Sequence, residues 1–176
     1  PGLGGTQRTA RICGVECARY AVLAGNFLDS STALDIGLLT HKVESSDVED
    51  IVFSLVGKKP DQKYPGKPLN DDSEVALFAK GFYSDKNIEA LISGKVPEDY
   101  DLEDPRVSRQ IKSLSRVAPI ALSIASDLLS DVRTGASLED GLKLELQRLG
   151  EIFSTEDAEE GLSALIEGRR PKYNSS

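Results

Sequence analysis

The feature that most constrains the fold of this chain is a series of helix start and stop signals in its last third, with apolar residues at helical spacing between them. Two patterns mark the start of a helix: an Asp directly before a proline, which places the proline at the first helical position, and a Ser three residues before an Asp, which is close to a capping box. A glycine marks the end of a helix. The signals are, in order, Asp104–Pro105, Pro119, Gly135, Ser137–Asp140 and Thr155. They predict four consecutive helices after residue 104.

The apolar residues of these four segments recur as they do on one face of a helix. In order along the chain they are Val107, Ile111, Leu114 and Val117; Ile120, Ile124, Leu128 and Leu129; Leu142, Leu144, Leu146, Leu149, Ile152 and Phe153; and Ala158, Leu162, Leu165 and Ile166. We therefore expect the last third of the chain to be helical throughout.

The first two thirds of the chain are also mostly helical in pattern, with shorter segments. The helices that we expect cover residues 8–24, 30–36, 45–56, about 72–82 and about 85–93. The expected N-caps are Asp29 for the second, Asp71 or Asp72 for the fourth, and Ser84 or Asp85 for the fifth.

Two segments differ from this helical pattern. Residues 38–43 carry β-branched residues in loose alternation and are the one convincing strand. Residues 57–70 concentrate Pro, Gly and Lys, as an irregular surface loop does. The predicted fold class is therefore mainly α, with at most one or two short strands.

Composition and charge argue against several classes of protein. The formal charge is −8, from 21 Lys and Arg against 29 Asp and Glu, whereas sequence-independent nucleic-acid binding needs clustered cations. The sequence has no run of about 18 apolar residues, so no membrane span is predicted.

Cys13 and Cys17 lie in a helical pattern with no further Cys or His beside them, so we interpret them as free thiols in a reducing compartment. Met is absent and Pro1 comes first, so we expect a piece of a longer protein.

Few residues carry a signal for chemistry, and each of these signals also has a plain structural interpretation. Gly2–Gly5 precede a helix as a phosphate loop does, but no Gly-Lys-Ser/Thr follows, which favours a structural turn. His41 has no nucleophile motif or second metal ligand beside it, so we interpret it as a partly buried or surface histidine. The carboxylates of the last third are interpreted as solvated or as partners of helix dipoles. They are Glu139, Asp140, Glu145, Glu156, Asp157, Glu159 and Glu160. Arg169, Arg170 and Lys172 form a basic tail.

Two stretches resemble the enoyl-CoA hydratase (crotonase) superfamily. The first is Pro-Gly-Leu-Gly-Gly-Thr-Gln-Arg at residues 1–8, with Gly14, Ala24-Gly25 and residues 29–38 after it. The second is Phe-Ser-Thr-Glu-Asp-Ala-Glu-Glu-Gly at residues 153–161, with Ala164, Glu167 and Arg169-Arg170-Pro171 after it. The superfamily has a similar glycine loop and a similar C-terminal ending in the same order. The resemblance covers residues 1–43 and about 118–173.

The resemblance implies a mechanism and a small set of site residues. In the superfamily two backbone N–H groups bind the thioester oxygen of an acyl-CoA, and two glutamates act as general base and acid. Hydratases carry these groups before the glycine loop, so no catalytic residue is assigned to this chain, and no metal site is implied. What remains is Gly2 as a backbone contact of the substrate, Leu3 beside the acyl pocket, and Arg169 and Arg170 as CoA contacts.

The implied function is hydration of trans-2-enoyl-CoA in fatty-acid β-oxidation by a cytoplasmic lyase without a cofactor. One alternative is a 3-hydroxyacyl-CoA thioester hydrolase, because residues 82–91 are similar to the 3-hydroxyisobutyryl-CoA hydrolase branch. Another is a fusion with a 3-hydroxyacyl-CoA dehydrogenase, which would bring NAD. A third is that these residues alone form a non-catalytic self-association module.

On this basis we divide the chain into three regions. Residues 1–57 are the tail of the crotonase core, residues 58–104 an inserted helical segment, and residues 105–176 a C-terminal helical oligomerisation region. The inserted segment has few apolar anchors, so we expect a peripheral flap in which Lys58–Pro68 is the most mobile part. Apolar faces left open predict a dimer or trimer. Neither nucleic acid nor a membrane is an expected partner.

Overall fold

The computed structural model describes residues 2–25, 27–58 and 66–174. Within them the chain forms ten α-helices and two 3-10 helices, and no strand. In chain order the elements are α1 (Gly5–Cys13), α2 (Val15–Val22), α3 (Ser30–Asp35), η1 (Ser45–Asp47), α4 (Val48–Leu55), α5 (Glu74–Phe82), α6 (Ile88–Ile92), α7 (Pro105–Leu114), α8 (Pro119–Asp131), η2 (Val132–Thr134), α9 (Leu138–Phe153) and α10 (Glu156–Glu167). The mainly α fold class is confirmed. None of these helices is long and apolar enough to cross a lipid bilayer.

The helices of the last third begin where the sequence predicts, because side-chain caps satisfy their first N–H groups. Ser137 Oγ accepts from the Asp140 N–H at 3.1 Å, and Thr155 Oγ1 accepts from the Ala158 N–H at 3.1 Å. Pro105 occupies the first position of α7, as the Asp-Pro pattern predicts.

Three predicted boundaries in the first two thirds are wrong. The expected helix over residues 8–24 is two helices, because Gly14 leaves the helical region with φ 80° and ψ 161°. The N-cap of α5 is Ser73, whose hydroxyl accepts from the Ala76 N–H, and not Asp71 or Asp72. The N-cap of α6 is Asn87, and not Ser84 or Asp85. Around the last two boundaries several Asp, Asn or Ser residues stand close together, so the sequence offered more than one candidate cap.

The predicted strand at residues 38–43 is also wrong. The Leu38 and Leu39 N–H groups both donate to the Ala33 carbonyl oxygen, at 2.8 and 3.1 Å. These two residues therefore form a turn that closes the C-terminal end of α3. Residues 41–44 then run without regular structure. An extended segment becomes a strand only when a second one pairs with its N–H and C=O groups, and the described residues provide none.

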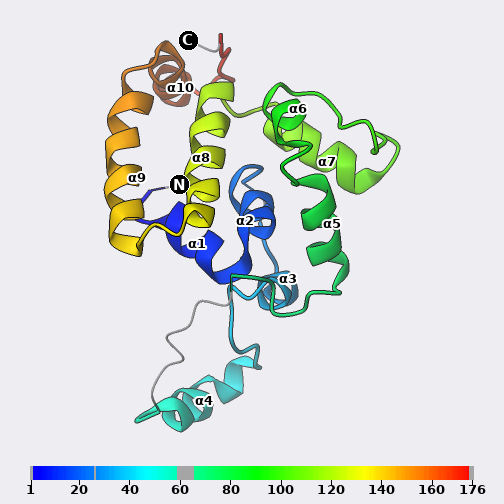
Figure 1. Ribbon diagram of the computed structural model, residues 1–176, viewed down its shortest axis with the longest axis vertical. Coiled ribbons are helices and arrows are strands. Elements are labelled where there is room, and N and C mark those ends of the chain that lie inside the picture. The colour runs from blue at the N-terminus through cyan, green and yellow to red at the C-terminus, as the bar shows by residue number, and fades with distance from the viewer. Residues whose placement is uncertain (1, 26, 59–65, 175–176) are drawn as a thin grey trace.

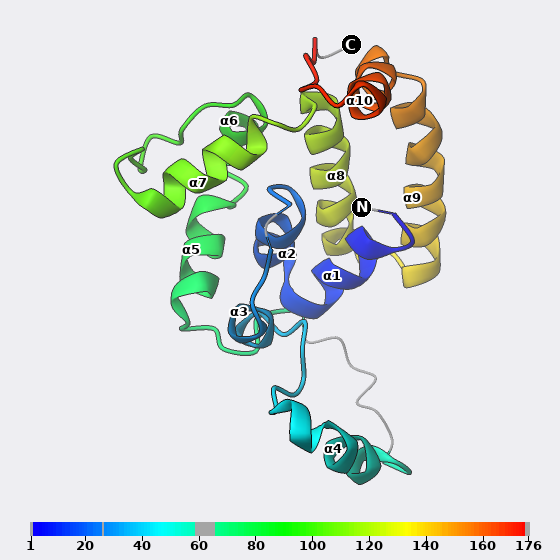
Figure 2. The same ribbon diagram turned by 180° about the vertical axis from the view of Figure 1, so that it is seen from behind.

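The body of the molecule is built around α8. In both ribbon views α9 lies along one side of α8, and α5 lies on the other side of the body (Figures 1 and 2). Helices α1, α2, α6 and α9 all contact α8 directly. The core between them contains fully buried side chains such as Ile36, Val107 and Leu129.

Helices α5 and α6 belong to this core, which corrects the expectation of a peripheral flap. Phe82 and Tyr83 have no exposed surface, and Leu91 is 1% exposed. The Phe82 ring lies edge-on to Tyr100, with centroids 5.0 Å apart, and Tyr83 meets Tyr20 of α2 at 6.1 Å. Aromatic side chains bury so much area that a few of them suffice to join this segment to the core. The mobility expected of Lys58–Pro68 concerns mostly residues 59–65, which lie outside the described residues. The division into three regions stays a prediction.

Helix α4 is the exception to this packing. It stands away from the body (Figures 1 and 2). Its largest side chains face outward, with Val52 56%, Phe53 73% and the following Val56 72% exposed. An apolar face this open is unusual on a folded chain and indicates a surface meant to be covered.

Candidate functional site

The glycine-rich opening forms a tight turn that leads directly into α1. The Gly5 N–H donates to the Gly2 carbonyl oxygen at 3.1 Å, and Leu3 and Gly4 between them have φ of 57° and 78°. Leu3 is the one non-glycine residue with positive φ in the described chain, and this conformation costs a leucine about 1–2 kcal/mol. A side chain is excluded at Gly4, where a Cβ would lie 2.5 Å from Leu142 of α9. Such a strained turn persists only when its surroundings hold it.

Glu145, in the middle of α9, holds this turn from inside. Its carboxyl group accepts hydrogen bonds from the Gly4 N–H at 2.5 Å, from the Thr6 N–H at 3.2 Å and from the Thr6 hydroxyl. Glu145 is 5% exposed and Thr6 is fully buried. The first N–H groups of a helix have no partner within it, so this carboxyl group is a helix cap supplied by a distant part of the chain.

Gln7 ties the start of α1 to α8 and α9. Its Nε2 donates to the Leu128 carbonyl oxygen at 2.9 Å, and its Oε1 accepts from the Arg11 guanidinium at 2.7 Å. Helix α9 comes so close that a Cβ on Gly141 would lie 2.0 Å from the Gln7 Oε1. The buried Thr6 and Gln7 therefore position the turn and do not face a ligand.

Gly2 and Leu3, the predicted substrate contacts, lie together on the exposed side of this turn. The Leu3 side chain is 94% exposed, and the Leu3 carbonyl oxygen accepts a hydrogen bond from Arg8. A cavity of about 240 Å³ adjoins Glu145 between α2, α8 and α9, with walls that are mostly apolar. The turn thus presents an exposed apolar side chain, and the carboxyl group that holds the turn also lines an apolar cavity. That Gly2 and Leu3 contact a substrate stays a prediction.

Two carboxylates of the last third are buried, which corrects the expectation that all of them are solvated. Glu145 is 5% and Asp157 3% exposed, and Asp157 accepts from the Asn174 N–H at 2.8 Å. The signal for Glu145 was its position four residues after Gly141 and four before Leu149, on the inward face of α9. The sequence alone gave no partner for it, because Gly4 and Thr6 lie about 140 residues away.

The structure separates the two predicted CoA contacts. Arg169 is bound by two carboxylates, with its NH1 2.6 Å from Glu160 and its Nε 2.5 Å from Glu167. The hydrogen bond from Arg169 is the main reason that the pKa of Glu160 falls to about 2. Arg170 makes no such pair in the described chain and lines a separate cleft between the C-terminal tail, α6 and α7.

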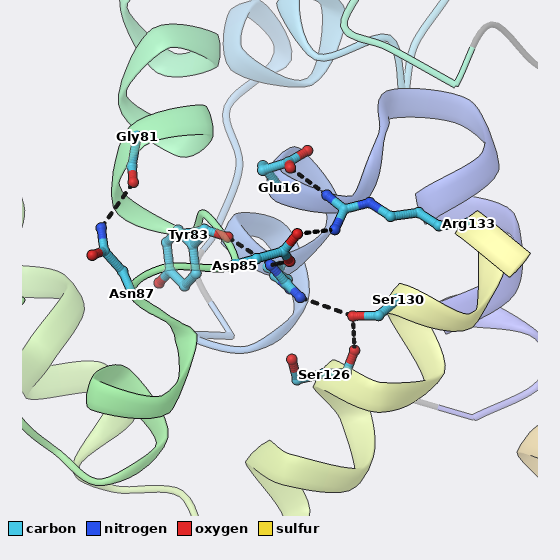
Figure 3. Close-up of polar contacts among 9 residues, drawn as sticks. Glu16, Gly81, Tyr83, Asp85, Asn87, Ser126, Ser130 and Arg133 are labelled. Atoms are coloured by element: carbon cyan, nitrogen blue, oxygen red, sulfur yellow. Dashed lines mark hydrogen bonds and ion pairs between the residues drawn. The ribbon is translucent and has the colours of Figure 1, made fainter.

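A buried arginine joins α2 to the α5–α6 connection and to α8. Arg19 is 2% exposed, and its guanidinium donates to the Tyr83 carbonyl oxygen at 2.9 Å and to Ser130 Oγ at 2.8 Å. The same group lies 2.8 Å from Asp85. Figure 3 shows Tyr83, Asp85 and Ser130 converging on this point, with the Ser130 hydroxyl in turn donating to the Ser126 carbonyl oxygen at 2.7 Å.

Asp85 continues this contact to the surface. It lies 2.5 Å from Arg133, which also pairs with Glu16 (Figure 3). Hydrogen bonds from Arg133 and Arg19 lower the pKa of Asp85. Two arginines face two carboxylates, so the charges balance and no free acid or base is left for chemistry. We interpret the cluster as a structural joint, which sequence patterns did not indicate.

The remaining candidate residues have structural environments. His41 is exposed, with Nδ1 2.9 Å from the Thr40 hydroxyl, as expected of a surface histidine. Cys13 and Cys17 are free, as predicted, and both are buried, which raises the pKa of each thiol to about 12. Across the residues that the structure describes, no group of three His, Cys, Asp or Glu side chains is arranged to hold a metal ion.

Comparison with known proteins gives one consistent result. The whole chain, residues 1–176, matches a family model described as enoyl-CoA hydratase/isomerase. It is 27% identical over 173 residues to a probable enoyl-CoA hydratase of Bacillus subtilis, covering 98% of the chain and 46% of that protein. It is 22% identical over 170 residues to a short-chain-enoyl-CoA hydratase of Clostridium acetobutylicum, covering 97% and 44%.

A third relative has a broader name. The alpha subunit of a fatty acid oxidation complex from Shewanella halifaxensis is 27% identical over 141 residues, which are 77% of the chain and 20% of that subunit. The chain thus spans less than half the length of each of these three relatives. No solved structure matches it significantly.

Proposed function

Since the match runs from the first residue to the last, this chain belongs to the enoyl-CoA hydratase/isomerase family, and we propose that it serves the hydration of trans-2-enoyl-CoA. In this proposal the two glutamates that handle water and proton are supplied from outside residues 1–176. The described residues contribute the turn at Gly2 and Leu3, which contacts the acyl thioester. The reaction uses no cofactor bound by these residues, and the cytoplasm is its proposed location.

The observation that supports this role is the strained turn itself. Leu3 keeps a left-handed backbone and a 94% exposed apolar side chain, while Glu145 and Gln7 fix the residues around it. Strain that the surroundings maintain at an exposed apolar residue is typical of a ligand-contacting position. The apolar cavity beside Glu145 gives the acyl chain a place to lie.

Of the two predicted CoA contacts, we propose Arg170. The guanidinium of Arg169 already serves Glu160 and Glu167, and a phosphate would have to displace both carboxylates. Arg170 has its charge free among the described residues and faces a cleft.

The hydrolase alternative has no support in the structure. Its basis was the similarity over residues 82–91, but Phe82, Tyr83 and Leu91 are buried in the core, where they touch neighbouring helices. Side chains that are buried for packing carry no information on which reaction takes place.

The test uses two thioesters and the gene product that contains these residues. With crotonyl-CoA we expect loss of the enoyl-thioester absorbance and no release of thiol. With 3-hydroxyisobutyryl-CoA we expect no thiol release above the background rate. Thiol release from the second substrate without hydration of the first would replace the proposal with the hydrolase. Residues 1–176 alone should hydrate crotonyl-CoA no faster than buffer, and turnover even at ~0.1 s⁻¹ would mean that they hold their own acid and base.

A further inference from the structure

A cavity of about 540 Å³ with many polar side chains lies between α2, α3, α5 and α7. In both ribbon views α3, α5 and α7 lie on the side of the body away from α9 (Figures 1 and 2). The volume is within the range of small-molecule sites. Gly2, Leu3 and Arg170 do not line this cavity, so it is separate from the residues of the proposed function.

The aromatic side of this cavity is held in place by contacts within the chain. Tyr20 and Phe78 line it and meet edge to face, with ring centroids 6.4 Å apart. Gln110 also lines it, is 3% exposed and accepts a hydrogen bond from the Tyr83 hydroxyl at 2.8 Å. These contacts do not depend on a ligand, so the cavity offers a preformed aromatic surface.

Two charges of opposite sign at this cavity have no partner. Arg106 of α7 is already paired, because its guanidinium lies 2.9 Å from the Asp104 carboxylate. Arg109, one turn further along α7, and Glu74, at the start of α5, are both exposed and make no hydrogen bond or ion pair with any described residue. They do not pair with each other either, although they line the same cavity. Both charges therefore remain available to a ligand that enters it.

The Tyr20 hydroxyl lies within electrostatic reach of charges of both signs. Burial raises the pKa of Tyr20, whereas Arg109 lowers it and Asp29 raises it. Asp29 stays ionised, because a hydrogen bond from the Thr32 N–H lowers its pKa. An exposed charge on its own needs no partner. A cation and an anion that both act on one partly buried hydroxyl, in a cavity with a second unpaired carboxylate, form a dipolar site.

We propose that this cavity binds a free α-amino acid with an apolar side chain. The carboxylate of the ligand accepts hydrogen bonds from the Arg109 guanidinium and the Tyr20 hydroxyl, and its ammonium group donates to Asp29 and Glu74. The apolar side chain lies against Phe78. An α-amino acid carries both charges on one carbon atom, so a single small ligand meets the charges of both signs.

The experiment measures binding to the gene product that contains these residues, so it needs no catalysis. The probes are L-phenylalanine, 3-phenylpropanoate, which lacks the ammonium group, and 2-phenylethylamine, which lacks the carboxylate. Ligand-observed NMR titration is suited to them because it also measures weak binding. We expect phenylalanine to bind and each analogue to bind about tenfold more weakly, which is about 1.4 kcal/mol.

Substitution of each unpaired charge should affect only the probes that carry its partner. Arg109→Ala should weaken phenylalanine about tenfold, as loss of a charged hydrogen bond implies, and leave 2-phenylethylamine unchanged. Glu74→Gln should weaken phenylalanine and leave 3-phenylpropanoate unchanged. This crossed pattern would not result from a general loss of structure, which weakens all three probes alike.

The matched controls remove the same charges from exposed positions outside the cavity. They are Lys112→Ala on α7 and Glu89→Gln on α6, and both should bind phenylalanine as the wild type does. Circular dichroism establishes that each variant is folded. Absence of phenylalanine binding, equal affinity for the three probes, or equal effects of the cavity and control substitutions would overturn the proposal. Hydration of crotonyl-CoA is measured separately, so either proposal can fail alone.

Discussion

At the scale of single residues, the geometry of the glycine-rich turn depends on one carboxyl group. Glu145 accepts three hydrogen bonds from Gly4 and Thr6, and its side chain is buried. No other described side chain accepts from these donors, so without Glu145 they would be left buried and unsatisfied. Unsatisfied buried donors destabilise the folded state far more than an exposed ion pair stabilises it.

We therefore expect Glu145→Ala to lower the free energy of unfolding by about 3 kcal/mol, as roughly 1–3 kcal/mol per unsatisfied group implies. Glu145→Gln retains one acceptor oxygen and should lose about half as much. The matched control is Glu139→Ala on the same helix, where the side chain is exposed and pairs with Lys143. That variant should stay within about 0.5 kcal/mol of the wild type. Urea denaturation supplies all four values, and equal effects at 145 and 139 would contradict the role of the cap.

The two thiols give a prediction in chemical reactivity. Cys13 and Cys17 are 0% and 1% exposed, and burial raises the pKa of each from 9.0 to about 12. At pH 8 the thiolate fraction is then roughly 10⁻⁴, so a disulfide reagent such as DTNB should react with neither in the native protein. In denaturant it should report two thiols, and one in Cys17→Ala.

The raised pKa values of the two thiols also predict that the free energy of unfolding depends on pH. The folded state holds the thiol protons more tightly than the unfolded state, so this contribution is complete below pH 9 and is lost as the pH rises from 9 toward 12. A Cys13→Ala/Cys17→Ala variant should lose less stability across that window than the wild type does. A wild type and a double variant with parallel pH profiles would show that these thiols do not titrate on unfolding.

At the scale of helices, α4 and α5 are a contrasting pair. Both carry a phenylalanine, but Phe53 is 73% exposed and Phe82 has no exposed surface. Phe82→Ala should therefore destabilise the chain by about 3–5 kcal/mol, since it leaves a cavity in the core. Phe53→Ala should change the free energy of unfolding by less than about 0.5 kcal/mol. Thermal and urea unfolding of the two variants compare them directly. A large loss at Phe53 would mean that α4 packs against the body.

The helices also show what the sequence could predict. Local signals sufficed for α7 to α10, because proline, caps and spacing act within a few residues. They were wrong for residues 38–43, since pairing of a strand depends on a partner outside the local pattern. They predicted the helices α5 and α6 but not their place in the core, where Phe82 contacts Tyr100 and Tyr83 contacts Tyr20 of α2.

The candidate site was predictable only in part, for the same reason. Gly2 and Leu3 came from resemblance to a family. Glu145, which holds them, had the spacing of an inward residue but no visible partner, because its contacts are about 140 residues distant.

At the scale of the whole molecule, two helical surfaces carry several exposed apolar side chains. One is α4, and the other is the outer side of α9 and α10, where Leu146 is 69%, Leu165 77% and Ile166 86% exposed. We expect sedimentation at tens of micromolar to give a dimer or trimer, because open apolar faces associate. Leu165→Asp/Ile166→Asp should shift the distribution toward monomer without lowering helix content. A wild type that sediments as a monomer over this range would contradict the expectation.

The hydrogen bonds that Glu145 accepts from the N-terminal turn have a consequence for biosynthesis. A ribosome adds roughly 5–20 residues per second, so Glu145 appears roughly 7–28 seconds after Gly4, which stands 141 residues earlier. Until then the N–H groups of Gly4 and Thr6 lack their acceptor, and nothing stabilises the left-handed backbone conformation of Leu3. A nascent chain that stops before α9 therefore lacks a finished glycine-rich turn, however well its earlier helices have formed. Completion of the C-terminal half is in this sense a requirement for the N-terminal turn to mature.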